Sequence, residues 1–261
     1  MLADDAARGF SLDSFGRNKS NWVTEMTTKT LHTIRFPAES AEYRAARDKL
    51  LEAEVALRAT TEAVAAQRRS LPLGGDLLED YVFDQWDAQE HDVRQVRLSE
   101  LFAPGTDTLF LYSFMFNPGP EGTPLDVGCP SCTSIIDAVD GSARHVMQRI
   151  SFAVEAKTSV ERFEAHARTR GWRHARLLSS AGNTYRHDYN CEQSDADQWP
   201  IATVFVRRGD RIHHWWSSEL FYVPPEAGMD MRHVDFMWPM WAIFDTTPSG
   251  RGDWSPELTY R

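Results

Sequence analysis

Gly128-Cys129-Pro130-Ser131-Cys132 is the most informative motif of this chain. A nearly continuous apolar run at residues 108–116 comes before it, and an apolar pattern with helical spacing follows it to about residue 149. A strand that is apolar throughout is typical of the buried centre of a sheet. The sequence therefore predicts a buried strand, a loop, and then a helix that opens at the two cysteines.

The spacing and position of the two cysteines predict redox chemistry. Cys129 and Cys132 are three residues apart, so on a helix they share one face and their sulfurs can meet. Pro130 suits the first helical position, where its missing N–H costs nothing. Cys129 then lies at the helix N-terminus, whose unpaired N–H groups favour a thiolate. We expect Cys129 to attack a disulfide and the more buried Cys132 to resolve the mixed intermediate.

Other interpretations of the pair stay open. One Cys-x-x-Cys can be half of a structural zinc site, or two buried thiols without chemistry, but the chain has no second such pair. The redox interpretation needs no cofactor. A metal site would combine the pair with histidine, since thiolate and imidazole together suit copper or zinc. Its candidate ligands are Cys129, Cys132, His187, His213, His214 and His233. Cys191 lies alone in a polar loop, and its role stays open.

The composition is that of an ordinary soluble globular protein. Among 261 residues, 42% are hydrophobic and 25% are charged. The net charge of −10 argues against nucleic acid or an anionic membrane as the main partner. No apolar run reaches the ~20 residues that cross a bilayer, and the acidic N-terminus lacks the apolar segment of a signal peptide. Three cysteines without an export signal predict a cytoplasmic location.

The sequence divides into three parts. Residues 1–36 mix small polar and scattered apolar residues, which predicts a loosely ordered N-terminal arm with Trp22 docked. Residues 37–75 predict a long amphipathic helix with Ser40 as its N-cap. Its apolar seam repeats every seven residues, at Tyr43, Leu50, Leu57, Val64 and Leu71. Such a seam suits a coiled-coil arm or, as we favour, a helix laid across its own domain.

Residues 76–261 predict an α/β domain with a mixed β-sheet flanked by helices, followed by an aromatic extension. The expected elements are a hairpin at residues 80–103, a strand at 108–116, the cysteine helix, a strand at 151–154, a helix at 159–170, strands at 177–178 and 203–206, and a last strand at 212–216. This order places two parallel crossovers before an antiparallel hairpin.

Several motifs in this order resemble one bacterial family with a thioredoxin-like fold. They are Tyr81-Val82-Phe83, Tyr112-Ser113-Phe114-Met115-Phe116, the Cys-Pro-Ser-Cys stretch, Gly171-Trp172, Ser179-Ser180-Ala181-Gly182, Asp188-Tyr189, Phe244-Asp245 and Pro248-Ser249-Gly250-Arg251. The chain is similar, over roughly residues 37–251, to a family catalogued as a domain of unknown function and described as predicted dithiol–disulfide oxidoreductases. Asp188-Tyr189 is similar to a loop of the peroxiredoxin-like members of the thioredoxin fold. The resemblance implies a thioredoxin-like fold and thiol–disulfide chemistry at Cys129 and Cys132.

Two departures from related patterns bear on the substrate. Thioredoxins have a cis-proline where this chain has Ala202 followed by Thr203, and that proline shapes a groove for extended peptides. Peroxiredoxins have a proline and a threonine where this chain has Gly122 and Asp126. We therefore expect a narrow thiol or disulfide substrate, small or protein, and slow reaction with peroxide. Pro130, Ala202 and Thr203 are candidate substrate-binding or supporting residues.

The aromatic segment 236–244 is the last feature of interest. It can form core, a homodimer surface or the wall of a small-molecule pocket, and Trp238 and Trp241 are its candidate substrate contacts. The prediction is thus a cytoplasmic thiol–disulfide oxidoreductase. The alternatives are a copper- or zinc-binding protein and a non-catalytic dimeric scaffold.

Overall fold

The computed structural model describes residues 31–87, 89–116, 128–194 and 197–260. The chain divides into two units, Met1–Arg69 and Ser70–Arg261. In the first unit, α1 (Ala41–Arg69) begins where the Ser40 hydroxyl accepts a hydrogen bond from the N–H of Tyr43 at 3.1 Å. This side-chain bond confirms Ser40 as the cap of the helix. The surface that its apolar seam contacts stays a prediction. Most of the expected N-terminal arm, including Trp22, lies outside the described residues.

Residues 70–75, which the sequence analysis placed with the long helix, belong to the second unit. The N–H of Gly74 donates to the carbonyl of His214 at 3.0 Å, and the N–H of His214 donates to the carbonyl of Gly75 at 2.9 Å. Asp76 continues this pairing as an isolated bridge to His213. The backbone of residues 74–76 thus pairs with that of residues 213–214, and the helix ends before this pairing, at Arg69.

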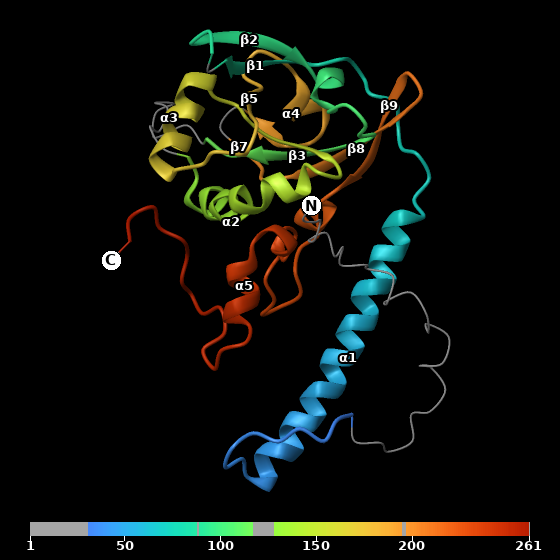
Figure 1. The fold of residues 1–261 in the computed structure, drawn as a ribbon, viewed down its shortest axis with the longest axis vertical. Helices are drawn as coiled ribbons and strands as arrows, with labels where there is room; N and C mark the ends of the chain where they lie inside the picture. The colour runs from blue at the N-terminus through green and yellow to red at the C-terminus, as the bar shows by residue number, and fades with distance from the viewer. Residues whose placement is uncertain (1–30, 88, 117–127, 195–196, 261) are drawn as a thin grey trace, which may run out of the picture. The chain divides into compact units, whose positions relative to one another are not determined.

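The second unit is built on a seven-stranded mixed sheet with the order β2-β1-β5-β4-β3-β8-β9 (Figure 1). Its strands are β1 (Val82–Asp87), β2 (Asp92–Arg97), β3 (Thr108–Phe114), β4 (Ser151–Ala156), β5 (Leu177–Ser179), β8 (Ala202–Arg208) and β9 (Arg211–Ser217). A separate two-stranded sheet pairs β6 (Glu192–Ser194) with β7 (Asp197–Gln198).

The pairing of the strands confirms the thioredoxin-like fold. At the centre, β3 runs parallel to β4 on one side and antiparallel to β8 on the other. The next strand outward, β5, is parallel to β4, while β9 forms a hairpin with β8. The β1–β2 hairpin is joined to β5 at the far edge. Two parallel crossovers followed by an antiparallel hairpin were the arrangement expected from the sequence.

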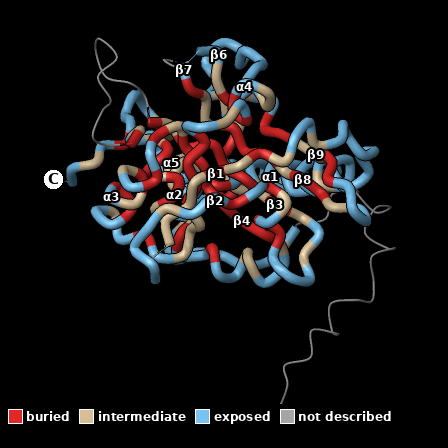
Figure 2. Tube along the Cα trace, turned by 90° about the horizontal axis from the view of Figure 1, so that it is seen from above, coloured by how far each residue is buried: buried red, intermediate tan, exposed pale blue. Residues whose placement is uncertain are grey.

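Both faces of the sheet are covered, and β3 has buried residues on each. Leu109 and Leu111 point to one face, whereas Tyr112 and Phe114 belong to the core cluster on the other. That second face carries α2 (Pro130–Val146) and α3 (Val160–Arg170), and the first carries the short α4 (Tyr185–Asp188) (Figure 1). All six residues of β4 are buried, and Figure 2 shows burial concentrated along the central strands.

The aromatic extension packs beside α2. It contains η4 (Glu219–Tyr222), η5 (Asp235–Met237) and α5 (Pro239–Phe244), and Figure 1 shows α5 next to α2. Met237 joins the core cluster that includes α2, whereas Phe236 and Ile243 are exposed. Only part of the aromatic extension is therefore buried in the hydrophobic core. Among the described residues, no helix is both long and apolar enough to cross a bilayer.

Candidate active site

Cys129 is the N-cap of α2, and Pro130 occupies the first turn of the helix, as the sequence predicted. The N–H of Cys129 donates to the carbonyl of Met115 at 3.0 Å, just beyond the end of β3. Its carbonyl accepts bonds from both the N–H and the hydroxyl of Thr133, at 2.9 and 2.8 Å. These bonds fix the backbone of Cys129 and leave its sulfur half-buried at the helix end.

The two thiols have opposite acidities. A hydrogen bond from the Cys132 thiol, together with the N–H groups of Cys132 and Ser131, lowers the pKa of Cys129 to about 6, against the effect of partial burial. Burial raises the pKa of Cys132 well above its ordinary value, and its bond to Cys129 adds to the rise. At neutral pH, Cys129 is therefore a thiolate and Cys132 is a thiol that donates to it.

Tyr112 lies beneath Cys132. Its hydroxyl donates to the sulfur of Cys132 at 3.3 Å, and the ring is fully buried. Burial raises the pKa of Tyr112 well above its usual value, so the phenol keeps its proton. This bond opposes the rise in the pKa of Cys132. Tyr112 can therefore stabilise negative charge on Cys132 when that thiol loses its proton.

His166 on α3 supports the loop from behind and was missed by the sequence analysis. The N–H of Gly128 donates to its Nδ1 at 3.4 Å, and its Nε2 lies 3.0 Å from the hydroxyl of Thr133. Because that hydroxyl donates to the carbonyl of Cys129, it accepts from His166 Nε2–H. Burial lowers the pKa of His166 to about 4, so the ring is neutral. His166 therefore orients the cysteine loop and brings no charge to it.

The backbone at Gly128 lies so close to the ring of Phe114 that only glycine fits there. A Cβ at this position would lie 2.4 Å from the ring of Phe114, a distance at which the ring must move. Phe114 packs in turn against Phe163 and His166, so the ring has little room to give way. The glycine before the cysteines therefore allows the loop to pack directly against the end of β3.

A buried ion pair fixes the end of β3 from the other side. Arg186 on α4 and Glu155 on β4 are both buried, with Nη1 and Oε1 2.8 Å apart. The same Nη1 donates to the carbonyl of Phe114 at 3.2 Å, and Nη2 donates to that of Cys191 at 2.9 Å. Burial raises the pKa of Cys191 to about 12. Cys191 is thus an inaccessible thiol, unlike Cys129.

Ala202 and Thr203 lie at the start of β8, and neither is accessible to solvent. The N–H of Ala202 donates to the hydroxyl of Ser218 at 3.0 Å, and its carbonyl accepts from the N–H of Ser218 at 2.9 Å. Both backbone polar groups of Ala202 are therefore occupied within the chain. These two residues can support the site but have nothing free to offer an extended peptide. The residues that correspond to the peroxiredoxin pattern, Gly122 and Asp126, lie outside the described residues.

Trp238 joins the extension to the cysteine helix. Its indole N–H donates to the hydroxyl of Ser134 at 2.8 Å, one turn after Pro130. Trp241 packs edge-on against Trp238, with ring centroids 5.3 Å apart, and the guanidinium of Arg251 lies over the ring of Trp241. The two tryptophans thus lie on one side of α2, and Trp238 contacts the helix directly.

A cavity of about 730 Å³ opens beside Pro130 on this side of α2. Asp137 on α2 and Arg170 on α3 lie on its wall, joined by an ion pair of 2.5 Å. Arg170 also donates to the carbonyl of Leu258 at 3.2 Å and to the hydroxyl of Tyr260, which draws the C-terminal tail along the cavity. The aromatic segment, which we considered as a possible pocket wall, contributes Met240 to this cavity, whereas Trp238 and Trp241 are not among its lining residues. The rest of the wall comes from α2, α3 and the C-terminal tail, which are far apart in the sequence.

The histidines of the metal alternative do not gather at the cysteines. His187 is largely exposed beside Asp188, His213 contacts Asp76 at 2.9 Å, and His214 contacts the hydroxyl of Ser217. His233 lies 3.3 Å from the carbonyl of Pro200. Among the described residues, no three side chains of His, Cys, Asp or Glu are placed to hold a metal ion. The ligand set Cys129, Cys132, His187, His213 and His214 is therefore not assembled.

Comparison with known proteins finds one matching family and several solved structures that are similar to this chain. It is similar in structure to the peroxidoxin BcpB from Mycobacterium tuberculosis, with 19% identity and a TM-score of 0.39 over 65% of this chain and 95% of the other. It is also similar to the reduced 2-Cys peroxiredoxin of Plasmodium vivax, with 16% identity and a TM-score of 0.41 over 64% and 97%. No curated protein matches it. The family described as "Bacterial protein of unknown function (DUF899)" matches residues 33–260, and the chain therefore belongs to that family.

Proposed function

We propose that this protein is a thiol–disulfide oxidoreductase that uses Cys129 as the attacking thiolate and Cys132 as the resolving thiol. The observation that carries this proposal is the contrast in acidity within one helical turn. Cys129 is half-buried with a pKa of about 6, and Cys132 is fully buried with its pKa raised. Inert buried thiols are not expected to differ in this way, because burial alone raises both pKa values.

The reaction transfers two electrons from the Cys129–Cys132 dithiol to the substrate disulfide. The Cys129 thiolate attacks one sulfur of the substrate disulfide, and the other sulfur leaves as a thiolate that takes a proton from water. Cys132 then gives its proton to water, with Tyr112 donating to the developing thiolate, and attacks the Cys129 sulfur. The second substrate sulfur leaves as a thiolate and takes a proton from water. The substrate is reduced to two thiols and the protein is oxidised to a Cys129–Cys132 disulfide, which a cellular dithiol must reduce again.

The surroundings of the site favour a narrow substrate. The backbone of Ala202 is bonded to Ser218 and cannot pair with an extended peptide. The cavity beside Pro130 has the size of a small-molecule site, and its walls include Met240 and Trp254. We infer a small, partly apolar disulfide or thiol as the substrate, bound along the side of α2 with its sulfur directed at Cys129. A cytoplasmic location and a homodimer remain parts of this proposal.

Trapping of the mixed disulfide tests the proposal. Cys132→Ser removes the resolving sulfur, so the variant should retain a covalent adduct on Cys129 when it is incubated with a bacterial extract and alkylated. Mass spectrometry of the tryptic peptide identifies the adduct. Cys129→Ser, prepared in the same way, should trap none, and Cys191→Ser provides a matched control that should turn over without accumulating one. Equal adducts on Cys129 and Cys191, or none on either, would contradict the assignment.

A further inference from the structure

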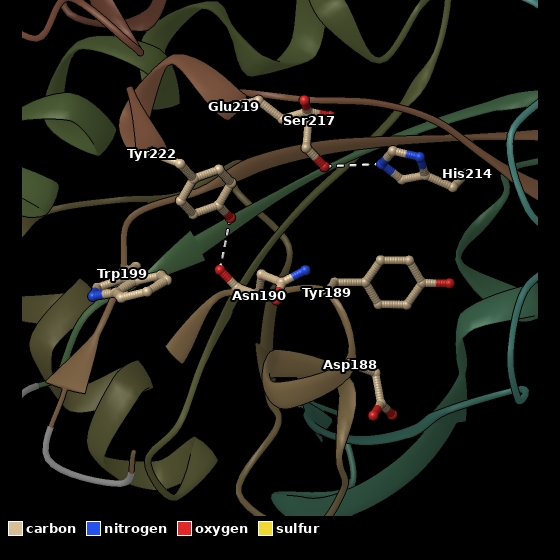
Figure 3. Close-up of a pocket in the computed structure, with 8 residues that line it drawn as sticks. All are labelled: Asp188, Tyr189, Asn190, Trp199, His214, Ser217, Glu219 and Tyr222. Carbon is tan, nitrogen blue, oxygen red and sulfur yellow. Dashed lines mark hydrogen bonds between the residues drawn. The ribbon is translucent and has the colours of Figure 1, made fainter. Parts of the chain in front are cut away.

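A second cavity lies on the opposite face of the sheet from α2. Its volume is about 470 Å³, and its wall is formed by α4, β9, η4 and the segment before β8 (Figure 3). Neither Cys129 nor Cys132 is among its lining residues. The proposed redox reaction gives this cavity no role, although it is built from the Asp188-Tyr189 motif and from the strand that carries His214.

Aromatic rings line the cavity in two pairs. Trp199 packs against Tyr222 with ring centroids 5.7 Å apart, and Tyr189 stacks on the imidazole of His214 at 6.0 Å. Figure 3 shows the pairs on either side of Asn190, whose carbonyl accepts from the hydroxyl of Tyr222 at 2.7 Å. That bond fixes the ring of Tyr222 at the mouth. Trp199, Tyr222 and Tyr189 therefore all contribute aromatic rings to the wall of this cavity.

The charges around this space are negative. Asp188 accepts hydrogen bonds from Tyr81 at 2.9 Å and Thr184 at 2.6 Å, with the Nδ1 of His187 3.2 Å away. Those bonds lower the pKa of Asp188, the bond from Thr184 most strongly, so its carboxylate is ionised. Glu219 is an exposed residue on the opposite side of the cavity, and it makes no ion pair with any described residue. Neither Lys nor Arg is among the lining residues.

His214 adds no positive charge to the cavity. Its Nε2 lies 2.9 Å from the hydroxyl of Ser217, which donates its own proton to Thr203. Ser217 therefore accepts from His214 and is not a nucleophile activated by it. Burial lowers the pKa of His214, which keeps the ring neutral at pH 7. Arg186, the buried cation behind the wall, is paired with Glu155.

We propose that this cavity binds an organic ammonium ion between Trp199, Tyr222 and Tyr189, with Glu219 as its counter-charge. Aromatic faces attract alkylated cations through the ring quadrupole, and this attraction grows where water is excluded. A neutral aromatic ligand would make no use of the two carboxylates, and an anion would be repelled by both. A cation that combines positive charge with methyl groups satisfies the rings and the carboxylate together.

Isothermal titration of the full-length protein with choline tests this proposal. The control ligand is 3,3-dimethylbutan-1-ol, which has the shape of choline without its charge. We expect saturable choline binding and at least about tenfold weaker binding of the neutral alcohol. Glu219→Gln should weaken choline several-fold, whereas Glu226→Gln, at an exposed glutamate outside the cavity, should leave it unchanged.

Two substitutions of Trp199 test whether its aromatic face contributes to choline binding. They are Trp199→Phe and Trp199→Ala. Phenylalanine keeps a π face and should retain most of the affinity, whereas alanine should lose it by about tenfold. Circular dichroism checks that both variants fold. Choline binding should persist in Cys129→Ser, because the site does not depend on the redox reaction. The proposal is overturned if the neutral alcohol binds as tightly as choline, or if neither choline nor tetramethylammonium shows saturable binding.

Discussion

Removal of the Cys132 thiol should make Cys129 less acidic. The bond from Cys132 is the largest contribution to the lowered pKa of Cys129, while the N–H groups of Cys132 and Ser131 contribute less. A hydrogen bond to a charged group is worth roughly 1.5 kcal/mol at its weaker end, and a thiol is a weak donor. Because 1.36 kcal/mol corresponds to one pKa unit, Cys132→Ala should raise the pKa of Cys129 by about one unit.

The pH dependence of alkylation by iodoacetamide measures this change. In the reduced wild-type protein the rate at Cys129 should rise through a midpoint near pH 6, since only the thiolate reacts. At pH 6 the variant should react about fivefold more slowly, because its thiolate fraction falls from about a half to about a tenth. Above pH 9 the two rates should converge. Cys132→Ser keeps a hydroxyl donor and should stay near the wild-type midpoint. An unchanged midpoint in Cys132→Ala would refute the hydrogen-bond explanation.

Three further predictions follow from the site and its supports. The protein should reduce insulin far more slowly than a thioredoxin, because the backbone of Ala202 is already paired; a thioredoxin-like rate in the turbidity assay would disprove the narrow substrate. Hydrogen peroxide should oxidise Cys129 no faster than an ordinary thiol, since Gly122 and Asp126 replace the peroxiredoxin proline and threonine, and rapid stopped-flow oxidation would show otherwise. Arg186→Met should destabilise the fold by roughly 3–5 kcal/mol in urea unfolding, because it removes the cation that neutralises the buried Glu155 and leaves that carboxylate only the hydroxyl of Ser180; Arg208→Met, at an exposed ion pair, should cost roughly 1 kcal/mol or less.

The core of the fold could be predicted because its signals are local. The apolar run of β3, the helix after it and the hairpin at Gly209 can each be recognised from a few neighbouring residues. The end of the helical segment could not be placed as well. Residues 74–77 form their backbone hydrogen bonds with β9, about 140 positions later in the sequence. No local sequence pattern indicates a pairing partner at that separation.

The candidate site was predictable only at its two cysteines. Their spacing and Pro130 indicate the helix N-terminus directly, whereas the groups that support them come from other elements. Tyr112 is one of several apolar residues in its strand, and nothing local distinguishes it. His166 had a detectable signal, since it follows Phe163 by three residues on the apolar side of α3 and is a polar residue on a buried face.

The most direct test of the redox assignment is the reversible formation of one disulfide. The purified protein would be equilibrated in glutathione buffers of increasing oxidised fraction, alkylated, digested and analysed by mass spectrometry. We expect a single two-electron transition in which Cys129 and Cys132 become joined, with Cys191 alkylated only after unfolding. Dithiothreitol should return both thiols. Failure to form the Cys129–Cys132 bond, or glutathione left stably attached to Cys129 while Cys132 stays reduced, would contradict the dithiol mechanism.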